Sequence, residues 1–356
     1  MKTERIEFLD AIKAVSILLV VYCHFITLSK ETVTGNFFMS VAWCAVPCFM
    51  MTTGAVLHQK NEFSWSKYIR QLIRTYIIVC IWRLIYLLVF YQIAEFHYGK
   101  RETVQYLFMF NDLDAVNTGL MWYMIAYIVV MCLYPVTYQL FRMHERKTLA
   151  FMMGLAFLSG IMVPSVNWAL TKLHDKFQLP VVTFEGLNKM LPFLNYGNMI
   201  FYFILGAFLF EYKEQILSKI KRWILFPLII VSGFCIMLVK YADTGEIAWA
   251  GKYLTGGYTH ISVMICSLAI WLALYAYADD HKKLHHFLSK YIGQHTMGIF
   301  YLHYILLAII SVTMFPLIKS RYSFGMNCIK TIFVTAVCVV LTKIMKKLPA
   351  IKMLVK

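Results

Sequence analysis

Charged residues are scarce in this chain. Of its 356 residues only 15% are Asp, Glu, Lys or Arg, whereas an ordinary soluble domain carries about 25%. Hydrophobic residues make up 60%, and the mean hydropathy is +0.66. The sequence also lacks a Pro/Gly/Ser-rich linker and a soluble appendage. These absences exclude a large soluble protein and predict one all-α domain, residues 1–356, that is integral to a membrane.

Acidic residues are scarcer than basic ones, and the formal net charge is +16. Such a charge could indicate nucleic-acid binding. Here, however, the positive charges lie in short loops between apolar runs, where a membrane protein needs them. We therefore expect membrane lipids as neighbours and no nucleic-acid partner.

Metal-binding and redox motifs are also missing. The nine cysteines form no C-x-x-C pair, and Cys44 and Cys48, one helical turn apart, are interpreted as small packing residues. The cluster of His281, His285 and His286 resembles a metal-binding tract but lies among lysines, so we expect no metal site.

About ten apolar stretches approach the roughly 20 residues that cross a bilayer. The first carries Asp10, Lys13 and His24 and lacks a small-residue cleavage site, so we interpret it as a span and not as a signal peptide. The predicted spans are 11–29, 36–57, 75–96, 120–141, 148–170, 193–211, 223–242, 260–278, 296–318 and 328–346.

The loops between these spans carry unequal charge. Of the 34 Lys and Arg residues, 22 lie in the set that includes both termini, and 10 lie in the other set. This asymmetry predicts that both termini are cytoplasmic. The other loops, 97–119, 171–192 and 243–259, carry aromatic residues and carboxylates, which suit sugar binding or an interfacial aromatic belt. These residues are Asp112, Asp114, Glu185, Trp249, Tyr253 and Tyr258.

Three ionisable residues of the first span are the candidate catalytic residues. Lys13 and His24 are eleven residues apart, so on a helix they return to within about 20° of one face and lie roughly 16 Å apart along the axis. Asp10 lies close to the same stripe. Ionisable groups are costly in lipid and usually face a partner or a watered cavity. A neutral His24 imidazole could accept a proton from a hydroxyl, or it could be a packed histidine bonded to a backbone carbonyl.

Cations near the cytoplasmic surface could hold phosphates of a cofactor. Lys13 is one candidate, although it could equally be a lysine that reaches to the interface. Arg70 and Arg74, one turn apart, are either a phosphate clamp or a determinant of topology. Arg83 lies deeper and needs a carboxylate such as Glu95 or Asp10, backbone carbonyls, or a ligand phosphate.

Further candidates lie near the predicted outer face and in a late span. Trp122 and Tyr123 open the fourth span, where they could bind an acceptor or belong to an aromatic belt. His303 lies within an apolar span and has the same alternatives as His24. The segment 46–57 holds Pro, Gly and two Thr residues, and we interpret it as a site of close helix packing.

Six segments in order resemble the acyltransferase-3 family of membrane O-acyltransferases. The family signature in the first span, an Arg followed after ten residues by a His, resembles LDAIKAVSILLVVYCHF. The other matching segments are VPCFMMTTGAVL, YIRQLIRTY, GLMWYMIAYIVVMCLYP, FYFILGAFL and IGQHTMGIFYLHYILL. Within this family, the segments MWYMIAYIVVMCLYP and IWRLIY are similar to those of the branch that contains the enterobacterial common antigen and surface-polysaccharide O-acetyltransferases. Three positions depart from the pattern: Lys13 replaces an Arg, Thr53 replaces a Ser, and Gln71 stands where a second Arg often lies.

The resemblance implies an enzyme of the bacterial cytoplasmic membrane. It implies an acyl-CoA donor, with acetyl-CoA expected, and a hydroxyl acceptor on a surface polysaccharide or lipid-linked glycan precursor. In that case Lys13, Arg70, Arg74 and Arg83 would hold the donor. A transporter of a small solute or acyl group is the alternative, because buried ionisable residues also mark transport pathways.

Overall fold

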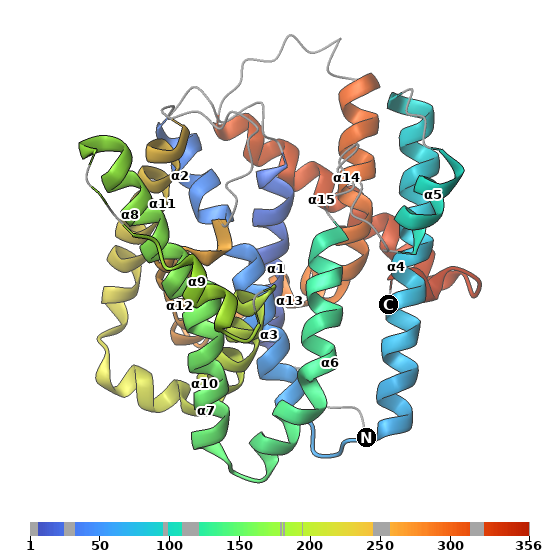
Figure 1. Cartoon of the computed structure of the whole chain (residues 1–356). Coiled ribbons are helices and arrows are strands. Elements are labelled where there is room, and N and C mark those ends of the chain that lie inside the picture. The colour runs from blue at the N-terminus through green and yellow to red at the C-terminus, as the bar shows by residue number, and fades with distance from the viewer. Residues whose placement is uncertain are drawn as a thin grey trace. The chain divides into compact units, whose positions relative to one another are not determined.

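The computed structural model describes residues 6–24, 33–94, 99–108, 121–178, 180, 182–193, 195–244, 257–313 and 324–355. Most residues in these ranges are helical and none is in a strand, which confirms the expected all-α class (Figure 1). The helices form two compact units. Unit 1 comprises Met1–Lys60, Leu133–Gln294 and Tyr322–Ile329, and unit 2 comprises Asn61–Cys132, His295–Arg321 and Lys330–Lys356.

Unit 1 is built around its first helix, α1 (Glu7–Cys23), which packs against four others and has most of its residues buried. In Figure 1 α3 runs alongside α1. The other helices of unit 1 are α2 (Val33–Ala42), α3 (Ala45–His58), α7 (Arg146–Phe157), α8 (Val163–Phe177), α9 (Glu185–Met190), α10 (Gly197–Lys219), α11 (Leu225–Thr244), α12 (Ile261–Ala276) and α13 (Lys282–Tyr291).

The contact between α3 and α10 depends on two glycines. A Cβ atom on Gly54 would lie 1.8 Å from the carbonyl oxygen of Phe203, and one on Gly206 would lie 1.9 Å from that of Met51. The two helix backbones therefore touch, as small residues allow between membrane helices. This confirms the interpretation of segment 46–57 as a site of close packing.

Unit 2 has an aromatic core. The indole of Trp82 stacks on the ring of Tyr301 at 4.8 Å and donates to the carbonyl of Leu354 at 2.9 Å, while Tyr86 donates to the carbonyl of Tyr301 at 2.9 Å. Its helices are α4 (Trp65–Ala94), α5 (Lys100–Leu107) and α14 (Thr296–Thr313), and it shares α6 (Trp122–Arg142) and α15 (Phe324–Lys347) with unit 1.

Seven described helical stretches are long and apolar enough to span a membrane. The count of ten predicted from the sequence is therefore not confirmed. The other three fall short for different reasons: α1 has 17 described residues, α12 has 16, and charges such as Glu211 and Lys213 interrupt the second half of α10. The seven are Val33–His58, Trp65–Phe90, Trp122–Arg142, Arg146–Phe177, Arg222–Asp243, Lys282–Ile310 and Phe324–Lys347.

In unit 1 the two predicted sets of loops gather in two separate places. At the start of α11, Arg222 pairs with Asp280 at 3.0 Å. This pair joins two loops of the charge-rich set, which is the set that includes both termini and 22 of the Lys and Arg residues. At the end of α11, Asp243 accepts a hydrogen bond from Trp168 at 2.6 Å and pairs with Lys172 at 3.1 Å, which joins elements of the other set. The 20 residues of α11 separate the two places by about 30 Å.

Candidate functional site

Asp10 and Lys13 form an ion pair one turn inside α1. The Lys13 Nζ atom donates to Asp10 Oδ1 at 3.0 Å, and both side chains are largely buried. The chain after α13 comes close at this turn, since a Cβ on Gly293 would lie 2.4 Å from the Asp10 carbonyl oxygen. Only glycine at position 293 permits this approach. The pair is thus held in place by its own helix and by a neighbouring segment.

His24 caps the C-terminus of α1. Its backbone remains in the right-handed helical region, at φ −82° and ψ −7°, and its N–H donates to the Val21 carbonyl at 3.3 Å. The helix is therefore continuous from Lys13 to His24, and helical periodicity leaves both on one stripe. Of the predicted first span 11–29, the structure describes the part up to His24, and residues 25–29 lie outside the described part.

The end of α1 near His24 has a buried cationic neighbour. Lys240 of α11 is only 7% exposed and lies near Cys23. Lys240 is one of the 10 Lys and Arg residues that the charge count assigned to the second set of loops, and this assignment is wrong, because Lys240 lies inside α11. The available signal was its position inside the predicted span 223–242. Apolar side chains pack around the same end of α1: Leu19, Tyr22, Met39, Ala42, Trp43 and Phe324.

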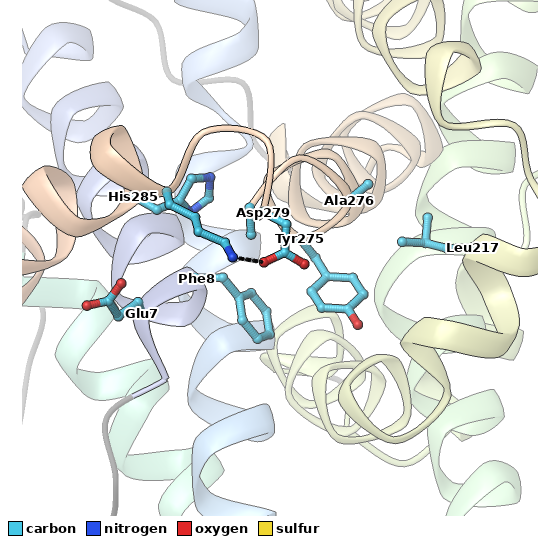
Figure 2. Close-up of a pocket in the computed structure, with 9 residues that line it drawn as sticks. Glu7, Phe8, Leu217, Tyr275, Ala276, Asp279 and His285 are labelled. Carbon is cyan, nitrogen blue, oxygen red and sulfur yellow. Dashed lines mark ion pairs between the residues drawn. The ribbon is translucent and has the colours of Figure 1, made fainter.

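A cavity of about 440 Å³ lies at the other end of α1 (Figure 2). Phe8 and Tyr275 form aromatic walls, with ring centroids 4.9 Å apart. His285 also lines it and is buried, whereas the ion pair of Asp279 and Lys282, at 3.4 Å, is exposed. Glu7 completes the polar lining, and the charges of the cavity are mixed. Sequence gave no signal for this cavity, because its lining comes from distant segments.

Arg70, Arg74 and Arg83 all lie on α4 of unit 2. That helix begins at Trp65, so Arg70 and Arg74 lie in its first turns, exposed and one turn apart. No carboxylate of the described residues pairs with either guanidinium. Both groups are therefore available to an anion.

Arg83 is buried and contacts Tyr106 of α5. Its Nη1 atom donates to the Tyr106 carbonyl at 2.6 Å, and its guanidinium lies 4.8 Å from the centre of the Tyr106 ring. The sequence predicted a carboxylate, a backbone carbonyl or a ligand phosphate as the partner of Arg83, and the structure shows a backbone carbonyl. Asp10 pairs instead with Lys13, and Glu95 lies outside the described residues.

Tyr123 and His303 both lie near Phe300 in unit 2. The ring of Tyr123 is 5.4 Å from that of Phe300, and the ring of His303 is 6.2 Å from it. His303 is fully buried, and its Nδ1 atom lies 3.0 Å from the Ile299 carbonyl of its own helix. Trp122 is half-buried, with its ring 6.4 Å from that of Tyr123.

Of the aromatic and acidic residues expected in the outer loops, two are described. The ring of Tyr258 packs edge-on against Trp43 at 4.8 Å, and Glu185 begins α9. The others, Asp112, Asp114, Trp249 and Tyr253, lie outside the described residues.

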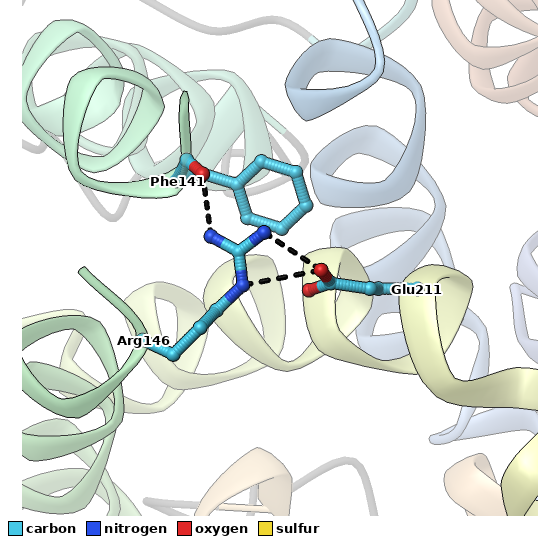
Figure 3. Close-up of polar contacts among 3 residues, drawn as sticks. All are labelled: Phe141, Arg146 and Glu211. Atoms are coloured by element: carbon cyan, nitrogen blue, oxygen red, sulfur yellow. Dashed lines mark hydrogen bonds and ion pairs between the residues drawn. The ribbon is translucent and has the colours of Figure 1, made fainter. Parts of the chain in front are cut away.

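An arginine clamp fastens α7 to α10 (Figure 3). The Nε and Nη2 atoms of Arg146 donate to Glu211 Oε1 at 3.2 and 2.7 Å, its Nη1 atom donates to the Phe141 carbonyl, and the guanidinium lies 4.0 Å from the centre of the Phe141 ring. Arg146 is one of the 22 Lys and Arg residues in the set of loops that includes both termini. The structure adds a packing role for it.

These features define a polytopic helical membrane protein with ionisable residues on its first helix. A family model described as "Acyltransferase domain", that of the acyltransferase-3 family, matches residues 6–343. The chain belongs to this family and is a membrane acyltransferase. No curated protein matches it.

Proposed function

We propose that the protein transfers an acetyl group from cytoplasmic acetyl-CoA to a hydroxyl of a surface polysaccharide or of its lipid-linked precursor. The observation that carries the proposal is the arrangement on α1, where Lys13, paired with Asp10, and His24 lie on one continuous helix of an acyltransferase-3 chain. The resemblance of the same segments to polysaccharide O-acetyltransferases supports the choice of acceptor.

In this proposal His24 is the general base. Its imidazole takes the proton of the acceptor hydroxyl as the oxygen attacks the thioester carbonyl. The C–O bond forms, the C–S bond breaks, and the thiolate leaves with the proton from His24. The products are an O-acetyl ester and coenzyme A, and atoms and charge balance without a metal.

The basic residues hold the donor. Lys13, Arg70 and Arg74 would contact its phosphates, with Arg83 supporting the same site, and Asp10 would orient the Lys13 ammonium through the 3.0 Å pair. Asp10 and His24 are fourteen residues apart, about 21 Å along the helix, so Asp10 acts through Lys13 and not on the imidazole. We assign Trp122, Tyr123 and His303 to acceptor binding.

We further propose that the enzyme resides in the bacterial cytoplasmic membrane with both termini in the cytoplasm. In this arrangement α1, α10 and α12 complete a set of ten crossings. Donor and acceptor then approach from opposite sides of the membrane.

The test compares His24→Asn with His144→Asn in cells whose glycan O-acetylation depends on this protein. His144 is exposed and has a φ of 60°, which Asn tolerates, so the chemical change is matched. We expect His24→Asn to lower glycan O-acetylation, measured by mass spectrometry, by at least about 100-fold, the lower bound for general-base catalysis. His144→Asn should retain it, and both proteins should reach the membrane in equal amounts.

Purified protein supplies a second readout. Coenzyme A should bind both variants with the affinity of the unaltered protein, measured by calorimetry, because His24 contacts the acceptor proton and not the phosphates. Full acetylation by His24→Asn would contradict the catalytic role. Failure of the unaltered protein to bind coenzyme A would favour the transporter alternative.

A further inference from the structure

Helix α13 connects α12 to the segment before α14 and contains no acidic residue: its sequence is KKLHHFLSKY. One face is buried, where His285 and Ser289 are 5% and 4% exposed. The helix packs against α1, and His286 bonds to Glu7 at 2.8 Å. The helix is thus fixed at the end of unit 1 where the charge-rich loops meet.

A second face of α13 is apolar and exposed. Leu284, Phe287 and Tyr291 are 54%, 52% and 42% exposed. Their spacing of three and four residues puts them on one stripe. The rings of Phe287 and Tyr291 are in contact, with centroids 5.0 Å apart. These three apolar side chains are therefore not part of the buried core, and their apolar character needs another explanation.

Two lysines flank the apolar stripe. Lys283 and Lys290 are seven residues apart and so lie on the same side of the helix. Neither forms an ion pair with a carboxylate in the described part of the chain, although Lys290 Nζ lies 5.6 Å from the centre of the Tyr291 ring. Asp279 pairs with Lys282, Asp280 with Arg222, and Glu7 with His286.

We propose that α13 is an interfacial helix that binds anionic phospholipids. Leu284, Phe287 and Tyr291 insert at the level of the head groups, and Lys283 and Lys290 contact the lipid phosphates. An apolar stripe beside a basic one is the pattern of helices that lie in a membrane surface. The positive charge of the two lysines favours anionic lipid over neutral lipid. Because the protein spans a bilayer, lipid head groups already lie beside α13.

Hydrogen–deuterium exchange on the full-length protein tests this proposal. The protein is placed in nanodiscs of phosphatidylcholine alone or of phosphatidylcholine with phosphatidylglycerol. We expect the peptide 282–292 to exchange at least threefold more slowly with phosphatidylglycerol, and high salt should reduce the difference. Each basic residue near an anionic surface contributes roughly fivefold to binding.

The variant Lys283→Gln/Lys290→Gln should lose the difference between the two lipids. Lys219→Gln/Lys221→Gln is the matched control, since it removes two exposed lysines at the end of α10 and just after it, and it should keep the difference. Equal exchange in both lipids overturns the proposal, as does a difference that survives Lys283→Gln/Lys290→Gln. Protection in detergent that rises with protein concentration would instead assign the stripe to a second copy of the chain.

Discussion

At the scale of single residues, Lys13 stands where the first-span signature that this chain resembles has an Arg. An ammonium binds phosphate as a point charge, whereas the family guanidinium can bind in a bidentate manner. The Asp10 carboxylate holds the ammonium at 3.0 Å and fixes its direction. In the proposed function, Lys13 is therefore the residue at which donor binding is tuned without a change of fold.

Lys13→Gln is expected to weaken coenzyme A binding about tenfold, because one charge-assisted contact to phosphate is lost. Turnover at saturating donor should change less, as expected for a contact made equally in the ground state and the transition state. Calorimetry and steady-state kinetics check the two parts. Lys13→Arg, which restores the family residue, should retain activity.

Arg70→Gln and Arg74→Gln should behave like Lys13→Gln if the three cations hold one donor. Lys219→Gln provides a matched control, because Lys219 is also exposed and near the charge-rich loops. Binding of coenzyme A that is indifferent to Lys13, Arg70 and Arg74 alike would move the donor site elsewhere.

At the scale of elements, the contact of α3 with α10 leaves no room for a side chain at either of its two glycines. Gly54→Ala and Gly206→Ala would each force backbone apart by more than an ångström. We expect each to lower the free energy of unfolding by about 1–3 kcal/mol or more. Thermal unfolding of the purified protein measures the effect.

Gly154→Ala is the control for these glycine variants. Gly154 lies within α7, and a Cβ there meets no atom within 4 Å. Alanine favours a helix by up to about 1 kcal/mol over glycine, so this variant should be neutral or stabilised. A Gly54→Ala protein as stable as Gly154→Ala would contradict the close packing of α3 and α10.

The Arg146–Glu211 clamp is the second element-scale prediction. Both side chains are less than one third exposed, and the contact has two N–H donors on one oxygen. A double-mutant cycle with Arg146→Gln and Glu211→Gln should give a coupling of about 1 kcal/mol in unfolding free energy. If the effects of the two changes on the unfolding free energy are additive, the ion pair does not stabilise the contact between α7 and α10.

At the scale of the whole molecule, the number of crossings decides where the termini lie. Seven crossings would put the termini on opposite sides, whereas ten put both on one side. We expect green fluorescent protein to be fluorescent at either terminus, and alkaline phosphatase to be active when inserted after Val182, an exposed residue of a predicted outer loop. Termini on opposite sides would contradict both the topology and the entry of the donor beside Lys13.

The sequence alone determined the membrane class, the helical fold and the placement of Lys13 and His24 on one helix. Hydropathy, charge asymmetry and the helical repeat are local properties, so they can be read along the chain without knowledge of its neighbours. The same local signals identified segment 46–57 as a packing site. They did not locate the end of α1 at Cys23, because an apolar run does not show where a helix ends.

Only the tertiary structure decided which distant residues meet. Gly54 packs on residue 203, Arg83 on Tyr106, and Glu7 on His286, and each pairing depends on which helices are neighbours. The burial of Lys240 follows from the same cause, since a residue near the end of a span is covered only if other helices pack there. Single-sequence patterns carry no information on such neighbours, because they depend on contacts between segments up to hundreds of residues apart.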